Sequence, residues 1–168
     1  MNIRPLHSII ASLLTVVIAG CGTLTDEQLW LKVEAAKKNN NWDSTRQVCS
    51  RILQEYPGST YAPWAQFGLA ESFRFKNQPR EALDNYKIFY EKYPDMQPSA
   101  VSLFLIGYMY NNTFHLTDSA KIFYYQFLKK YPDHDLAPTV RTEIEYMGKD
   151  PAQVLQEMQR SKKRAVKK

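Results

Sequence analysis

The sequence predicts an all-α protein, a right-handed superhelical solenoid of about three helical hairpins followed by C-terminal capping helices. A Tyr-Pro pair occurs at residues 56–57, 93–94 and 131–132, so the prolines recur at intervals of 37 and 38 residues. An aromatic-rich amphipathic stretch precedes each pair, and a polar turn and a second apolar stretch follow it. A fixed period of this size is typical of a helical unit that buries its apolar face only against its neighbours.

The expected helices follow one another in order, and several carry a start signal. Thr25 to Gln28 reads Thr-Asp-Glu-Gln, which is the pattern of a capping box. Pro79 stands where a helix would begin, at the first helical position that proline favours. The turn at residues 112–117 is one residue longer than its counterparts, which accounts for the 38-residue interval. The expected helices are residues 25–38, 42–56, 63–76, 79–93, 99–111, 118–131 and 138–147, with a short eighth from 151 to about Gln159.

Residues 1–20 form a separate segment. Ser8 to Ile18 is an apolar run that is too short for a stable transmembrane helix. It ends in Ile18-Ala19-Gly20-Cys21, where small residues suit a signal-peptidase pocket and the cysteine suits thioether lipidation. This pattern resembles the bacterial lipoprotein lipobox, and the alternative is a buried helix. The resemblance implies cleavage between Gly20 and Cys21, and stable anchoring by several acyl chains, diacylglycerol among them, on Cys21. Gly22 after the cysteine implies delivery to the periplasmic face of the outer membrane.

Charge is distributed unevenly along the chain. The net charge is +5, but residues 160–168 contain six basic residues and no acidic one. The remainder of the chain after the signal is close to neutral and has no basic stripe, which argues against nucleic-acid binding. The expected division is a signal peptide at 1–20, a lipidated tether at 21–24, a helical repeat domain at 25–159 and a disordered basic tail at 160–168. Two readings of the tail stay open: a solubilising end, or a contact with anionic lipid headgroups.

In repeats two and three, small residues stand where two helices approach and large residues stand where hairpins meet. This pattern resembles the tetratricopeptide repeat family over about residues 25–147. The resemblance is clearest in the second repeat, closely matched in the third and degenerate in the first. The matching positions are Leu69, Ala70, Phe73, Ala82, Tyr86, Phe89 and Pro94, then Ile106, Gly107, Tyr110, Ala120, Tyr124, Phe127 and Pro132, then Val33, Ala36, Thr45, Cys49, Ile52 and Pro57.

A narrower resemblance combines the lipobox with the turns Tyr-Pro-Gly-Ser-Thr-Tyr-Ala and Tyr-Pro-Asp. These features are similar to outer-membrane-assembly lipoproteins of the BamD type, with residues 56–94 the closest part. Proteins of that type carry further repeats after the third, whereas this chain continues into a short helix and a basic tail. A shorter relative with another partner is therefore an equal expectation.

The first helices of the hairpins are expected to line a concave groove that binds an extended or helical peptide. Large aromatic side chains supply much contact area there and are frequent among binding hot spots. An arginine in the groove is suited to bind a carboxylate, including a peptide C-terminus. The alternative is that these aromatics only pack against the adjacent hairpin. The expected groove residues are Trp30, Trp64, Phe67, Arg74, Phe104 and Tyr108.

No pattern of catalytic residues stands out, so we expect a protein that is not an enzyme. None of the three histidines has a companion at metal-ligand spacing, and no phosphate loop or nucleophile elbow is present. No metal and no cofactor is expected, apart from the acyl groups on Cys21. Cys49 lies on a predicted buried helix face and is interpreted as a small core residue.

The leading hypothesis is a lipid-anchored adaptor that gathers other envelope proteins, in outer-membrane protein assembly. The alternatives are a cell-wall or division coordinator, and a carrier of a small hydrophobic ligand in the aromatic groove.

Overall fold

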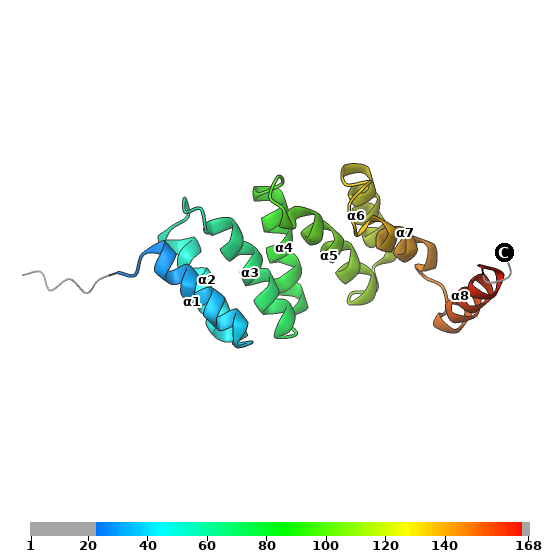
Figure 1. Ribbon diagram of the computed structural model, residues 1–168, viewed down its shortest axis with the longest axis horizontal. Helices are drawn as coiled ribbons and strands as arrows, with labels where there is room; N and C mark the ends of the chain where they lie inside the picture. The colour runs from blue at the N-terminus through cyan, green and yellow to red at the C-terminus, as the bar shows by residue number, and fades with distance from the viewer. Residues whose placement is uncertain (1–22, 166–168) are drawn as a thin grey trace, which may run out of the picture.

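The computed structural model describes residues 23–165, and the predicted signal segment, with Gly20 and Cys21, lies outside that range. The described chain is all-α, and its helices form an elongated array that runs from α1 at one end to α8 at the other (Figure 1). Helices adjacent in the chain, from α1 to α7, pack against one another as sequential hairpins. The helices are α1 (Asp26–Lys38), α2 (Trp42–Glu55), α3 (Ala62–Phe75), α4 (Pro79–Lys92), α5 (Pro98–Asn112), α6 (Thr117–Lys130), α7 (Ala137–Tyr146) and α8 (Pro151–Ala165).

The capping box at the start of α1 is confirmed. The Thr25 hydroxyl accepts a hydrogen bond from the Gln28 backbone N–H at 3.2 Å. In return, the Thr25 N–H donates to Oε1 of Gln28 at 3.0 Å. Two N–H groups that the helix itself cannot satisfy therefore have partners, and α1 begins where the sequence predicts.

The three Tyr-Pro pairs end α2, α4 and α6 in the same way. Proline disfavours the α conformation of the residue before it, and Tyr56, Tyr93 and Tyr131 have φ of −134°, −131° and −131°. Each tyrosine N–H still closes the last helical turn, with N–O distances of 2.8, 2.9 and 2.7 Å. Each tyrosine carbonyl then accepts from the N–H three residues later, which opens the turn into the next hairpin. One local rule therefore produces the period seen in the sequence.

The turns inside the hairpins also repeat. Asn40, Asn77 and His115 have φ of 53°, 55° and 55°, in the left-handed region that asparagine and histidine tolerate better than most residues. The last of these turns, between α5 and α6, is one residue longer than the other two, as the sequence predicts.

The core consists of three clusters, and each cluster joins one hairpin to the first helix of the next. Leu29, Val33, Cys49 and Ile52 of the first hairpin pack with Ala65 of α3. The second cluster joins α3 and α4 to α5, and the third joins α5 and α6 to α7. This nearest-neighbour packing is the way a repeat protein buries its apolar surface.

The end of α8 is a correction to the sequence analysis. The expected helix stops near Gln159 and a disordered tail begins at residue 160, but α8 continues to Ala165. Arginine, lysine and alanine are good helix formers, so the charge of residues 160–164 does not end the helix. Within residues 23–165, no helix has both the length and the apolar character needed to cross a bilayer.

Candidate functional site

A row of polar side chains connects the first helices of successive hairpins with one another. We call it the first-helix row and define it as Lys37, Glu71, Arg74, Tyr108, Asn111 and Glu143, from α1, α3, α5 and α7. The ammonium of Lys37 donates to the Glu71 carboxylate at 2.7 Å, with 37% and 18% of the two side chains exposed. At the other end, the Asn111 amide donates to the Glu143 carboxylate at 3.4 Å. The row therefore runs across the hairpins rather than along one of them.

Arg74 lies in the middle of the row, at the end of α3. Its Nε donates to the hydroxyl of Tyr86 at 3.2 Å, and its guanidinium carbon lies 4.2 Å from the centre of the Phe75 ring. Burial raises the pKa of Tyr86 to about 12, so this phenol stays protonated and serves as the acceptor. The side chain of Arg74 is exposed, so its remaining N–H groups face solvent.

Arg74 and Tyr108 line the same pocket of about 210 Å³ between the α3–α4 turn and α5. Leu105 and Met109 form apolar walls, and Asn77 and Thr113 add an amide and a hydroxyl. A cation, neutral hydrogen-bonding groups and apolar walls together suit an acidic or carboxyl-terminal side group carried by an extended chain.

Glu143 completes the row at α7. Its carboxylate accepts from the Tyr124 hydroxyl at 3.2 Å, besides the amides of Asn111 and Asn112. Burial, followed by the nearby Glu143 charge, raises the pKa of Tyr124 well above the usual range of a phenol. Tyr124 is consequently a donor in this cluster, and it ties α6 to the first helix of the following unit.

The six predicted groove residues divide into two groups. Trp64 and Tyr108 are 37% and 41% exposed, and Arg74 is exposed as well. Trp30, Phe67 and Phe104 are half-buried and make aromatic contacts within the fold. Trp30 stacks on Tyr61 at 5.6 Å, Phe67 meets Tyr86 and Phe89 edge-on at 5.8 and 5.4 Å, and Phe104 stacks on Tyr124 at 6.3 Å.

Two further features were not predicted as functional. Glu143 lies on α7, which the sequence analysis treated as a capping helix, and its acids Glu143 and Glu145 on a short amphipathic helix gave no signal of a functional role. Trp42 stacks on Phe75 with ring centres 4.1 Å apart, and Phe75 in turn lies beneath Arg74. The sequence did contain a signal for this stack. An aromatic residue stands at each of two hairpin turns, Trp42 after Asn41 and Phe75 before Lys76.

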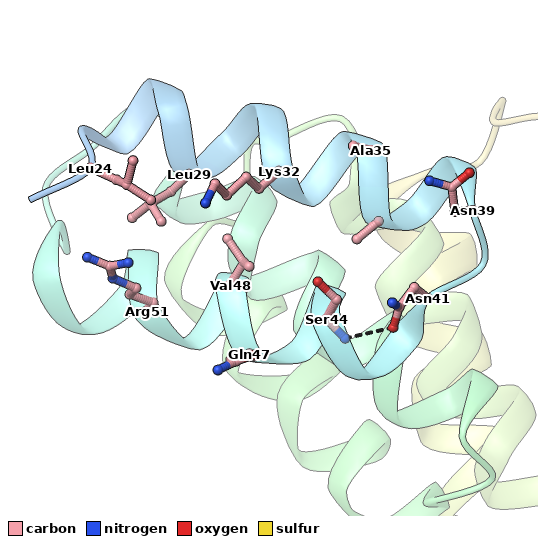
Figure 2. A pocket seen from close by; sticks show the side chains of 11 residues that line it. Leu24, Leu29, Lys32, Ala35, Asn39, Asn41, Ser44, Gln47, Val48 and Arg51 are labelled. Carbon is pink, nitrogen blue, oxygen red and sulfur yellow. Dashed lines mark hydrogen bonds between the residues drawn. The ribbon is translucent and has the colours of Figure 1, made fainter.

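A second pocket, of about 490 Å³, lies on the outer side of the first hairpin and contains none of the predicted groove residues. Figure 2 shows Lys32 of α1 and Arg51 of α2 among the side chains around it, with Leu29 and Val48 between the two helices. The Asn41 side chain caps α2 there by accepting from the Ser44 N–H at 3.0 Å. The pocket lies where an internal hairpin would contact the unit before it, and Leu24, Leu29 and Val48 are the apolar side chains that such a contact would cover.

Across residues 23–165 no group of three or more His, Cys, Asp or Glu side chains is arranged to hold a metal ion. Cys49 is fully buried, and burial raises the pKa of its thiol to about 12. A thiol in that state is a core residue rather than a nucleophile.

Two segments match the family model of the tetratricopeptide repeat, residues 64–95 and 101–134. They cover α3 with α4 and α5 with α6, the hairpins that contribute Glu71, Arg74, Tyr108 and Asn111 to the row. No curated protein matches the chain.

Proposed function

From the two segments that match the tetratricopeptide repeat model, we propose that the first-helix row binds a segment of another protein and that the chain acts as a non-enzymatic scaffold. The observation that carries the proposal is the pocket shared by Arg74 and Tyr108. It joins an exposed cation to an exposed aromatic side chain on two adjacent hairpins. Arginine and tyrosine are, with tryptophan, enriched among binding hot spots.

The proposed ligand is an extended or helical segment that presents a carboxylate to Arg74. Lys37 and Glu71 already neutralise each other at 2.7 Å, so Arg74 is the cation of the row with N–H groups toward solvent. A guanidinium can bind a carboxylate through two parallel hydrogen bonds, which favours this group over an isolated hydroxyl or amide. Tyr108 on α5 and Trp64, nearer the start of α3, then supply apolar contact.

We also propose a location and a pathway. The lipobox-like sequence supports attachment through acyl groups on Cys21 to the periplasmic face of the outer membrane. The resemblance to assembly lipoproteins supports a role in outer-membrane protein assembly, and a cell-wall or division coordinator is the alternative within the same class. Carriage of a small hydrophobic ligand is less favoured, because the pocket of about 210 Å³ is smaller than the ~300–1,000 Å³ of typical small-molecule sites.

Site-specific photo-crosslinking tests the proposal in the source cells. A photoreactive residue replaces Tyr108 in the row, and a matched control replaces Tyr125 on α6, which is 58% exposed. The proposal expects a defined protein adduct from position 108 that is absent from position 125, and that Arg74→Glu removes. Equal adducts from both positions, or an adduct that survives Arg74→Glu, would contradict it.

A further inference from the structure

The C-terminal helix α8 (Pro151–Ala165) extends beyond the last hairpin at the far end of the array (Figure 1). Its start is well defined, because the Asp150 carboxylate accepts from the N–H groups of Ala152 and Gln153 at 2.7 and 3.4 Å. Its later turns do not pack against a hairpin. In the described part of the chain, the last pair of helices in extensive contact is α6 with α7. α8 is therefore a formed helix with much of its surface available.

One face of α8 is apolar. The helical register places positions 154, 155, 158 and 165 on this face, where the sequence has Val, Leu, Met and Ala, and it also places Lys162 there. Leu155 is 58% exposed. Val154 and Leu155 border a pocket of about 390 Å³ beside α7 rather than joining a core cluster.

The other face of α8 is basic. Glu157 is the only acidic residue between Pro151 and Ala165, and its carboxylate is paired with Lys149 at 2.9 Å. The sequence then provides Arg160, Lys162, Lys163 and Arg164 within the helix, with two further lysines after it. Register places positions 160, 163 and 164 opposite the apolar face. Cations on one side and leucine, valine and methionine on the other form the pattern of a helix that lies in a membrane interface.

We propose that α8 binds the surface of an anionic lipid bilayer, lying in the plane of the headgroups. The cations of α8 contact lipid phosphates, and the apolar face enters the boundary with the acyl chains. By register Lys162 falls within the apolar face, and a lysine there reaches the headgroups with its ammonium while its apolar stem stays in the boundary. Because Lys149 pairs with Glu157, the one acidic residue of α8, the net charge of the helix is positive. A positive helix is attracted to an anionic bilayer and not to a neutral one.

This inference does not rest on the proposed function of the first-helix row. If Cys21 is lipidated as we propose, however, α8 is a second attachment at the opposite end of the array from α1. The protein would then be held at both ends, with the first-helix row fixed in its orientation to the membrane.

A fluorophore placed in α8 tests the proposal in the full chain. The background is Cys21→Ser, and Leu155→Cys is labelled with an environment-sensitive dye, because the buried thiol of Cys49 does not compete for the reagent. The matched control carries the dye at Gln156→Cys, on the opposite face by register. Both proteins are mixed with vesicles of phosphatidylcholine alone and of equimolar phosphatidylcholine and phosphatidylglycerol. The dye at position 155, with its control at position 156, separates α8 from the N-terminal segment, which carries Arg4 and is itself attracted to anionic lipid.

The proposal expects a blue shift of the dye at position 155 with anionic vesicles only, reversed by salt, and no shift at position 156. Replacing Arg160, Lys163 and Arg164 by glutamine keeps good helix formers and should weaken vesicle affinity about a hundredfold, from the energy of near-surface charges. An equal shift in both lipid mixtures, or no shift in either, would overturn the proposal. A blue shift that grows with protein concentration in the absence of vesicles would also overturn the proposal, because it would show that the apolar face of α8 binds a second copy of the chain instead of a bilayer.

Discussion

Gly107 is the position at which a single atom decides the packing of the third hairpin. A Cβ built on this residue would lie 2.7 Å from two ring atoms of Tyr124, and Tyr124 is fully buried. The ring cannot move away easily, because its hydroxyl is bonded to Glu143. Glycine here is a requirement of close helix approach rather than of backbone conformation.

We therefore expect Gly107→Ala to lower the free energy of unfolding by about 1–3 kcal/mol, the usual cost of overpacking a core. Urea unfolding followed by circular dichroism measures it. Gly58→Ala is the matched control, since a Cβ there meets nothing within 4 Å and the residue has no positive φ. If both variants unfold at the same urea concentration, α5 and α6 do not approach each other closely enough at Gly107 to exclude a Cβ, and the prediction is wrong.

The thiol of Cys49 gives a prediction about pH. Burial raises its pKa to about 12, so the folded state holds this proton where an unfolded chain, with a cysteine pKa of about 8.5, releases it. The contribution to stability is therefore complete below pH ~8.5 and is lost as the pH rises toward the folded value. Stability should already fall between about pH 8.5 and 10, before the tyrosines of the unfolded chain titrate.

Thiol labelling measures the same property directly. In a Cys21→Ser background we expect the folded protein to resist a thiol reagent at about pH 8.5 and to react fully in denaturant. The fall in stability over the same range should be smaller in Cys49→Ala, which has no thiol to ionise. Rapid labelling of the folded protein would mean that Cys49 is accessible.

Residue burial was largely predictable, whereas the role of each aromatic was not. The predicted core positions Ala70, Ala82, Tyr86 and Cys49 are all fully buried, because the repeat pattern fixes which residues face a neighbour. Trp30 and Phe67, which were predicted for the groove, are half-buried and make aromatic contacts with Tyr61 and Tyr86. A small rotation of a first helix turns an aromatic side chain either toward the groove or toward the adjacent hairpin. The spacing of residues in the sequence does not distinguish these two positions.

At the scale of an element, α1 is the first helix of the described chain and has a neighbour on one side only. Its capping box therefore supplies stability that internal helices obtain from packing. Thr25→Ala should cost about 1 kcal/mol of unfolding free energy, while Thr25→Ser, which keeps the hydroxyl, should be close to wild type. Hydrogen exchange of the α1 amides, compared among the three proteins, locates the effect. Equal exchange in all three would show that the cap does not hold the helix end.

Helix starts and stops were predicted well where a stereochemical signal exists and poorly where none does. Pro79 and the Tyr-Pro pairs fix the bounds of α4 and the ends of α2 and α6 to within about a residue, the margin within which boundary assignments differ. The end of α8 has no proline or glycine, and residues 160–164 form helix as readily as the turn before them. The sequence analysis took the charge of residues 160–164 as a sign of disorder, but their helix propensity outweighs the repulsion between their charges.

At the scale of the whole molecule, the packing of each unit on the next places Lys37, Glu71, Arg74, Tyr108, Asn111 and Glu143 in one row. The sequence analysis chose Arg74 and Tyr108 from the repeat pattern, and both line one pocket. The lateral contacts that connect the row, such as Lys37 with Glu71 at 2.7 Å, depend on the rotation between hairpins. That rotation is a property of the assembled units and is not encoded in any one of them.

The central claim is that the first-helix row is the surface that binds a protein partner. The most direct measurement is the affinity of the partner identified by crosslinking for wild type, for Arg74→Glu with Tyr108→Ala, and for Lys129→Glu on the exposed side of α6. Loss of two hot-spot side chains should weaken binding by at least about 30-fold, with the α6 variant unchanged and all three proteins equally helical. Equal affinities for the double variant and wild type, or an equal loss in Lys129→Glu, would contradict the claim.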